Sequence, residues 1–133
     1  MIIEPGLRGV AELVVSRQNL ASYTGNLGAE VLSTHQVVLL MEQASRNAIA
    51  GRLPEGRISV GTEVRVRHFA ATPIGVGVRA ESELSAFEEG RMVFKVVVSD
   101  EFQKIAEGEN VQILVSVQSF LDRVRRKMKA QRR

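Results

Sequence analysis

Cysteine and tryptophan are absent from this 133-residue chain, and aromatic residues make up only 5% of it. Without cysteine there can be no disulfide, no thiolate metal site and no cysteine nucleophile, which fits a reducing compartment such as the cytoplasm. The start of the chain has no basic segment followed by an apolar run, so we expect no signal peptide. No apolar run approaches the roughly 20 residues of a membrane span, and no membrane partner is expected.

The net charge of +3 is distributed unevenly along the chain. Residues 119–133 contain seven basic side chains and one acidic side chain, whereas the preceding 118 residues contain 11 basic and 14 acidic ones. The body of the protein is therefore mildly acidic, and we expect no nucleic-acid-binding surface on it. The basic C-terminal segment could attract phosphates or an acidic partner, although a solvated helix end is the simpler interpretation.

The hydrophobic pattern predicts one long helix near the middle of the chain. Ser33 and Gln36 have the spacing of a capping box, and the helix is expected to continue to about Ala50. Apolar residues cover nearly every side of its first half, which predicts a helix buried all round. Before it, the pattern predicts a short strand at 10–15 and a loop or irregular helix at 18–28.

Four strands are expected after this helix. The first has a clear period of two that places a histidine on its apolar face, in the row Val60, Thr62, Val64, Val66 and His68. Alternation and turn residues predict the others at about 76–84, 92–99 and 104–118, and an amphipathic helix follows. We therefore predict an α+β fold with an antiparallel sheet curled around one helix, in a single domain spanning 1–133 with a basic C-terminal helix or tail at about 119–133.

Three polar side chains stand out because each lies on an otherwise apolar element. A buried carboxylate at Glu42 would suit a general base or an orienting group, but an exposed pair with Arg46 is equally consistent. His68 ends its strand before a loop, where it could shuttle a proton or simply bond a backbone carbonyl. Thr34 could supply a nucleophile or hold a water at the helix N-terminus, although threonine there is more often a cap.

Motifs for metals and nucleotides are missing from the sequence. Two histidines 33 residues apart, without cysteine, give little support to a zinc site. There is no Walker-type phosphate loop and no G-x-G-x-x-G segment. We therefore expect neither a metal nor a cofactor.

The run Gly61–Pro73, GTEVRVRHFAATP, together with Thr34 and Glu42, resembles the hot-dog thioesterases, and most of all the fluoroacetyl-CoA thioesterase-like family. That family has a threonine before its central helix, a glutamate eight residues later, and a histidine 26 residues after the glutamate and before an Ala-Ala-Thr-Pro segment. Thr34, Glu42 and His68 match these positions and spacings. The resemblance covers about residues 8–127.

This resemblance implies a hot-dog fold, assembled as a homodimer or a tetramer with active sites near the subunit interface, and hydrolysis of an acyl-CoA thioester. It implies that Thr34 is the nucleophile or a water-holding hydroxyl, Glu42 the activating or orienting carboxylate, and His68 the proton shuttle. Gly61 matches a glycine close to the substrate, whose backbone would contact the thioester carbonyl. Gly28 stands where the fluoroacetyl-specific enzyme has an aromatic lid residue, so a different acyl group is expected.

Three other functions are also consistent with these residues. A hot-dog protein could bind acyl-CoA without hydrolysing it, or a hydratase or dehydratase could move protons beside an intact thioester. A structural dimer could instead dock its basic tail on an acidic partner. The pattern does not rank the basic residues that could contact CoA phosphates, namely Arg57, Arg65, Arg67, Arg91 and Lys95.

Overall fold

The computed structural model describes residues 2–131, so Arg132 and Arg133 of the predicted basic tail lie outside the described residues. Its elements are β1 (Arg8–Val14), η1 (Arg17–Asn19), η2 (Ala21–Thr24), α1 (Thr34–Ala48), β2 (Arg57–His68), β3 (Gly77–Glu88), β4 (Arg91–Asp100), β5 (Lys104–Ser116) and α2 (Val117–Gln131). Within these residues, none of the helices combines the length and the apolar composition that crossing a membrane requires.

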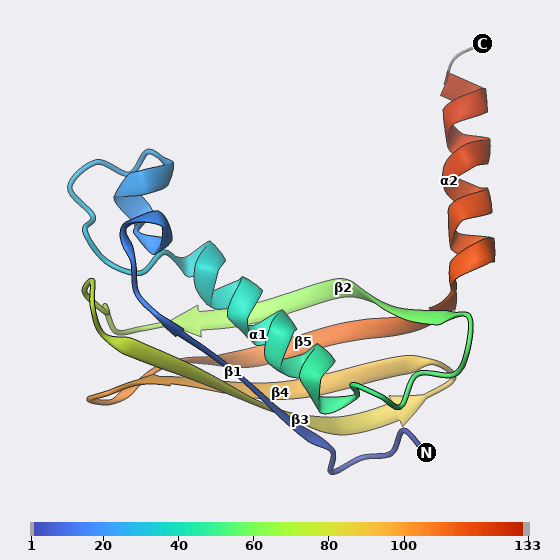
Figure 1. Ribbon diagram of the computed structural model, residues 1–133, viewed down its shortest axis with the longest axis horizontal. Helices are drawn as coiled ribbons and strands as arrows, with labels where there is room; N and C mark the ends of the chain where they lie inside the picture. Colours follow the sequence, from blue (N-terminus) through green and yellow to red (C-terminus); the bar gives the residue numbers. More distant parts are fainter. Residues whose placement is uncertain (1, 132–133) are drawn as a thin grey trace.

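The strands form one antiparallel sheet in the order β1-β3-β4-β5-β2, which leaves β1 and β2 at its edges. The sheet curves around α1, which lies along its inner face (Figure 1). Glu89 and Gly90 join β3 to β4 with φ angles of 49° and 80°, as expected for a tight hairpin. The predicted α+β architecture, a curled antiparallel sheet around a central helix, is confirmed.

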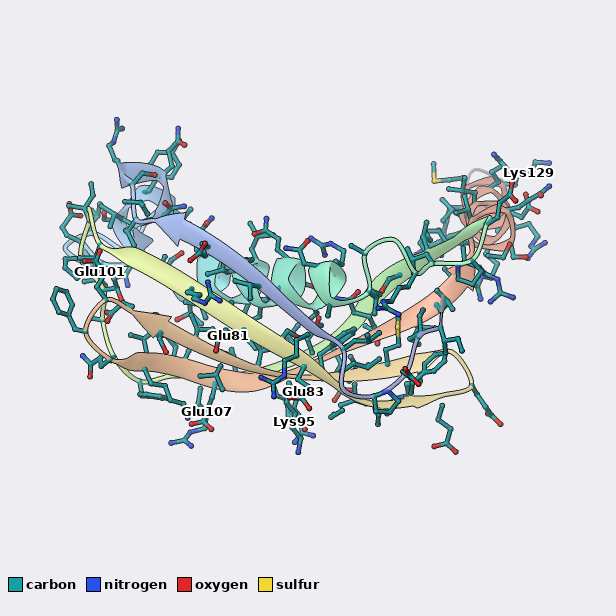
Figure 2. The ribbon with its side chains drawn as sticks, turned by 60° about the horizontal axis from the view of Figure 1, so that its bottom comes forward. Glu81, Glu83, Lys95, Glu101, Glu107 and Lys129 are labelled. Atoms are coloured by element: carbon teal, nitrogen blue, oxygen red, sulfur yellow. The ribbon has the colours of Figure 1, made fainter. Side chains whose placement is uncertain are left out.

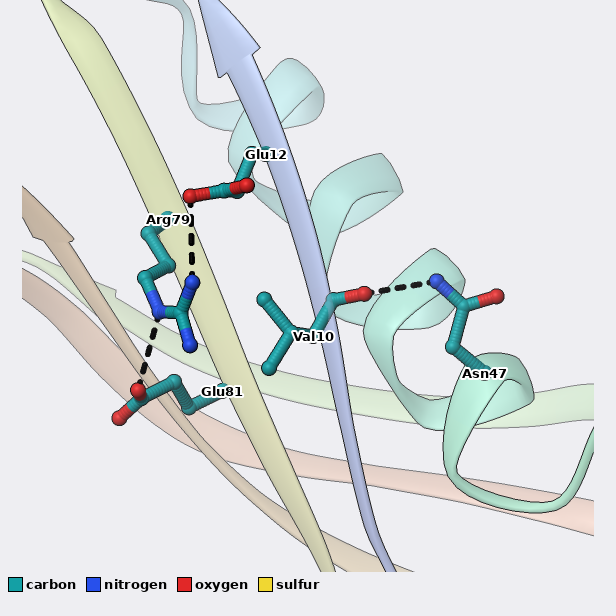
Figure 3. A network of polar contacts seen from close by, with 5 residues as sticks. All are labelled: Val10, Glu12, Asn47, Arg79 and Glu81. Atoms are coloured by element: carbon teal, nitrogen blue, oxygen red, sulfur yellow. Dashed lines mark hydrogen bonds and ion pairs between the residues drawn. The ribbon is translucent and has the colours of Figure 1, made fainter.

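One side of α1 packs on the sheet. The buried side chains of the helix are Val37, Leu40, Met41, Ala44, Ser45 and Ala48. Gly9 lets β1 approach closely, because a Cβ there would overlap the backbone of α1 at Ala44 and Ala48. The Asn47 side chain also donates a 2.7 Å hydrogen bond to the Val10 carbonyl of β1 (Figure 3). These contacts fix the helix against the β1 side of the sheet.

The prediction that α1 is buried all round is wrong. Leu39 is 43% exposed, and Gln43 and Arg46 are also exposed. The sheet curls around only one side of the helix, and no other element of residues 2–131 covers the opposite side. One buried stripe is enough to pack an amphipathic helix, so the additional apolar residues remain on the open side.

A β-bulge in β2 changes which residues face the helix. The register of β2 against β5 shifts between Gly61 and Glu63, which makes Thr62 the extra residue. Gly61 therefore lies on the inner face together with His68, while Val60 turns outward. The uninterrupted alternation predicted from the sequence placed Val60 and His68 on the same face, and it is wrong on the N-terminal side of the bulge.

The outer face of the sheet is charged. Figure 2 shows Glu81, Glu83 and Lys95 projecting from the side that faces away from α1. Arg79 bonds Glu81 at 3.0 Å and Glu12 of the neighbouring strand at 3.2 Å (Figure 3). Because these pairs are exposed, they solvate this face more than they stabilise the fold.

The second helix, α2, leaves the end of β5 and stands away from the sheet (Figure 1). Its apolar residues Leu121, Val124 and Met128 are 41%, 47% and 46% exposed. The predicted amphipathic C-terminal helix is confirmed, and its start lies beside the first residues of β2, where the Val117 amide bonds the Gly56 carbonyl at 2.9 Å.

Candidate active site

Thr34 and His68 meet at one end of the sheet. The Thr34 Oγ1 lies 2.9 Å from the His68 Nδ1. Thr34 is the first residue of α1 and His68 is the last residue of β2, so the contact joins the ends of two elements. A hydroxyl bonded to an imidazole in this way can transfer its proton to the ring as it attacks an electrophile.

Thr34 is free for this contact because Ser33 caps the helix. The Gln36 amide donates to the Ser33 Oγ at 3.4 Å, as the sequence predicts. The return bond of a capping box does not form, because the Gln36 side chain instead accepts a 2.9 Å hydrogen bond from Asn19. Thr34 is therefore not the cap of this helix, and its hydroxyl lies against His68 instead.

The loop after His68 is tied to the segment before Thr34. The Leu32 amide donates to the Thr72 carbonyl at 2.8 Å, and the buried Thr72 hydroxyl donates to Asp100 Oδ2 at 2.9 Å. Burial would raise the pKa of the Asp100 carboxyl, but hydrogen bonds from the Phe102 amide, the Thr72 hydroxyl and the Gln103 amide lower it below its usual value. This contact was not predicted from the sequence, where its only signal was a polar residue within the Ala-Ala-Thr-Pro segment.

The environment of His68 favours its neutral form. Burial lowers the pKa of the imidazole below its ordinary value of 6.5, and the backbone of Ala70 offsets part of that effect. The Nε2 atom is buried and has no hydrogen-bond partner among residues 2–131. A neutral ring retains one nitrogen that can accept a proton near pH 7, as a general base requires.

Glu42 faces β2 farther along the helix. Its Oε2 lies 2.6 Å from the position that a Cβ on Gly61 would occupy, so the glycine makes room for the carboxylate. Glu42 is half-buried, and across residues 2–131 it has neither an ion pair nor a hydrogen bond, including with Arg46. An unpaired carboxylate beside an exposed glycine can hold a water or orient a substrate group.

The Thr34–His68 pair and the Glu42–Gly61 pair lie apart within one chain. Thr34 and Glu42 are eight residues apart on α1, which corresponds to about 12 Å along the helix axis. His68 and Gly61 are seven residues apart on β2, or about 20 Å. The structure thus brings Thr34 to His68 and Glu42 to Gly61, but the two pairs are beyond hydrogen-bond reach of each other.

A buried polar network supports the bulge next to Gly61. Ser59 donates to Gln112, Gln112 donates to Asn110 at 2.7 Å, and Asn110 donates to the Glu63 carbonyl at 3.2 Å. Asn110 and Gln112 are fully buried and face the helix, so Val111 and Ile113, which alternate with them, lie on the other face of β5. The apolar row of β5 was predicted from the sequence, but its alternating amides were not recognised as a signal for this network.

Comparison with known proteins identifies relatives of the whole fold. The sequence profile of the family described as "Fluoroacetyl-CoA-specific thioesterase" matches residues 15–118. The fluoroacetyl-CoA thioesterase of Streptantibioticus cattleyicolor is 36% identical over 101 residues, which cover 76% of this chain and 73% of that protein. The range matched by the family profile, residues 15–118, includes both pairs of candidate site residues.

Solved structures agree with these sequence matches. A structure of the fluoroacetyl-CoA thioesterase is 30% identical and has a TM-score of 0.86, with 96% of this chain and 98% of that chain covered. A hypothetical protein of Thermus thermophilus, described as a thioesterase superfamily member, is 27% identical with a TM-score of 0.91, covering 98% and 97%. The chain therefore belongs to the fluoroacetyl-CoA-specific thioesterase family, and with it to the hot-dog thioester hydrolases.

Proposed function

We propose that this thioesterase hydrolyses an acyl-CoA with Thr34 and His68 as its reacting pair. The observation that carries the proposal is the 2.9 Å contact between Thr34 Oγ1 and His68 Nδ1. The lowered pKa of His68 supports it, because a base must be neutral at the working pH. A relative named for fluoroacetyl-CoA supports a CoA thioester as the substrate class, and such a substrate agrees with the predicted cytoplasmic location.

In this mechanism the imidazole removes the proton from the attacking oxygen. That oxygen belongs to Thr34 or to a water that Thr34 holds, and it attacks the thioester carbonyl carbon as His68 Nδ1 accepts its proton. The C–S bond then breaks, and the imidazolium returns the proton to the departing sulfur. A thiol with a pKa near about 8.5 leaves readily, so the main requirements are an activated oxygen and a stabilised oxyanion. If Thr34 attacks, water then hydrolyses its acyl ester.

We propose that Glu42 contributes to this site across a homodimer interface. β2 is an edge strand with one side unpaired, and such edges readily accept another strand. A two-fold axis near Val64, pairing two β2 strands antiparallel, would bring His68 of one protomer opposite Gly61 of the partner subunit. Glu42 of the partner subunit would then supply the activating or orienting carboxylate, and the glycine backbone would lie beside the thioester carbonyl.

We also propose that the acyl group differs from fluoroacetyl. Gly28 lies in an exposed loop with φ of 93°, and nothing lies within 4 Å of the position of a Cβ there. This residue places no aromatic ring over the site, and its left-handed backbone disfavours one. An acyl group larger than fluoroacetyl is consistent with such an open position.

The test is thiol release from short, branched, aromatic and long acyl-CoAs, with the wild-type protein measured beside Glu42→Gln. We expect release with one chain class and a kcat for the variant that is lower by on the order of 10². Saturable binding without release would instead indicate an acyl-CoA-binding protein. A change at the acyl α and β carbons with the thioester intact would indicate a hydratase or dehydratase.

A further inference from the structure

A basic cleft lies where the start of β2 meets the first turns of α2. It has a volume of about 410 Å³, and its polar lining consists of Arg57, Ser116, Ser119, Asp122, Arg123 and Arg126. The residues contributed by α2 recur at helical spacing, so they share one face of the helix. This face lies opposite the exposed apolar face of Leu121, Val124 and Met128.

Among residues 2–131, the arginines of the cleft have no acidic partner. Asp122 is already bonded to Arg125 at 2.8 Å. None of Arg57, Arg123 and Arg126 forms an ion pair with another residue in 2–131. Arginine forks and hydroxyl groups that converge on one cleft are suited to phosphate, which accepts several charge-assisted hydrogen bonds at once.

Two other arginines on the sheet are less suited to this role. Arg65, which the sequence could not distinguish from Arg57, lies 3.5 Å from Glu109 in a surface ion pair. Arg79 is shared between Glu12 and Glu81. Their charge is already balanced locally, whereas the cleft at α2 carries excess positive charge.

A row of small or polar residues links this cleft to Glu42. Arg57, Ser59 and Gly61 alternate along β2, so they lie on the face toward which Glu42 points. Gly61 is exposed and Ser59 is half-buried, so neither places a bulky side chain in the row. From Gly61 to Arg57 the strand rises about 13 Å, a distance that an extended pantetheine arm can span.

We propose that this cleft binds the phosphate groups of CoA through Arg57, Arg123 and Arg126, with the pantetheine arm lying along the Arg57–Ser59–Gly61 row. The thioester then lies at Gly61, beside the carboxylate of Glu42. This assignment rests on the acyl-CoA thioesterase function proposed above. It names the substrate contacts of the same site and gives the N-terminal part of α2 a role in binding.

The test compares two double variants of α2 that each remove two positive charges. Arg123→Ala/Arg126→Ala changes the cleft, whereas the control Lys127→Ala/Lys129→Ala changes residues of the same helix that do not line it; Lys129 is labelled in Figure 2. CoA, dephospho-CoA, adenosine 3′,5′-bisphosphate and inorganic phosphate are titrated by calorimetry. Turnover of an acyl-CoA is then compared with that of the matching N-acetylcysteamine thioester, which has no phosphate.

We expect the cleft variant to bind CoA about tenfold more weakly than the wild type does. Its kcat/KM for acyl-CoA, divided by its kcat/KM for the phosphate-free thioester, should fall by a similar factor. The control should change either quantity by less than about twofold, because its charges act only at a distance. Equal weakening in both variants, or unchanged CoA affinity in the cleft variant, would overturn the assignment. Inorganic phosphate binding as tightly as CoA would instead indicate a site for a free anion.

These measurements separate the subsite from the catalytic proposal. If no thioester is hydrolysed but the cleft variant still loses CoA affinity, the thioesterase function fails and the phosphate subsite stands. If acyl-CoA is hydrolysed and its KM is the same in the wild type and the cleft variant, the subsite alone fails.

Discussion

At the scale of single residues, the candidate site depends on Thr34 and His68, whose side chains are not used by the local structure around them. Ser33 takes the capping role, which leaves the Thr34 hydroxyl free to contact His68 at 2.9 Å. The ring is half-buried, so its neutral form is favoured and it can accept the hydroxyl proton. Burial thus lowers the pKa of His68, and in the proposed mechanism Thr34 supplies the reacting or water-holding oxygen.

The first prediction concerns this pair. His68→Ala should lower kcat by on the order of 10² or more, the usual range for loss of a general base. Thr34→Val should do the same because it removes the hydroxyl and keeps the branched shape, whereas Thr34→Ser should retain part of the activity. His35→Ala is the matched control, since that histidine is exposed and its ring lies 3.3 Å from the Ser33 hydroxyl, while the Thr34 hydroxyl contacts His68. Steady-state turnover in which His68→Ala equals the control would exclude His68 as the base.

The pH dependence provides the second prediction. Burial places the pKa of His68 below 6.5. We therefore expect kcat/KM to stay constant near neutral pH and to decrease at acidic pH, with an apparent pKa below 6.5. The unfolded chain, with its ordinary histidine, binds a proton more readily than the folded state. The stabilisation that His68 brings is therefore complete above about pH 6.5 and is lost as the pH falls.

Urea unfolding of the wild type and His68→Asn between about pH 5 and 8 checks the sign of this effect. Toward about pH 5, the unfolding free energy of the wild type should decrease relative to that of His68→Asn. A wild type that gains stability relative to the variant as the pH falls would contradict the proposed environment of His68.

At the scale of elements, α1 and β2 carry the site and the loops on either side hold them in register. Leu32, just before α1, bonds Thr72, just after β2, and Thr72 is anchored on Asp100. The bulge at Thr62 turns Gly61 toward the helix, where its missing side chain makes room for Glu42. Two glycines therefore have different roles, since Gly9 admits the helix backbone and Gly61 admits a carboxylate.

The third prediction compares alanine at these two glycines. Gly61→Ala should lower kcat/KM and leave the unfolding free energy nearly unchanged, because its Cβ meets only the flexible end of the Glu42 side chain. Gly9→Ala should destabilise the fold by about 3 kcal/mol, because its Cβ meets the helix backbone, which has to move. Unfolding free energies and kcat/KM are measured for both variants. Equal loss of stability in the two would show that Gly61 is required for packing and not for the position of Glu42.

Local patterns predicted much of the fold and of the site. The helix, the strands and the Ser33 cap follow from periodicity and capping chemistry, and the inward position of His68 follows from alternation in the half of β2 beyond the bulge. The family resemblance identified Thr34, Glu42, His68 and Gly61 as site candidates.

Features that depend on partners distant in the sequence could not be predicted. The bulge at Thr62 arises from pairing with β5, and the open side of α1 arises from how far the sheet curls. The bond from Thr72 to Asp100 joins the loop after β2 to the end of β4, 28 residues away. Eight residues of helix do imply a separation of Thr34 from Glu42, but only the structure shows that Gly61 lies with Glu42 and not with His68.

At the scale of the whole molecule, one chain carries two separate pairs of candidate site residues. One end carries Thr34 and His68, and the middle of α1 and β2 carries Glu42 and Gly61, about 12 Å away along the helix. In the proposed homodimer, a second copy pairs with the open edge of β2 and covers the open side of α1, which joins the two pairs. Each active site would then use both protomers, with two equivalent sites per homodimer.

Subunit complementation tests whether each active site combines Thr34 and His68 of one chain with Glu42 of the other. His68→Ala and Glu42→Gln are mixed in equal amounts, unfolded and refolded together, and thiol release is measured. Half of the dimers are then mixed, and each mixed dimer has one intact site if the two halves come from different chains. A site shared between two chains predicts recovery of about one quarter of wild-type activity. It predicts no recovery in the control mixture of His68→Ala with Thr34→Val, because both substitutions then affect the same pair of site residues. A His68→Ala and Glu42→Gln mixture as inactive as either variant alone would contradict it and place the whole site within one chain.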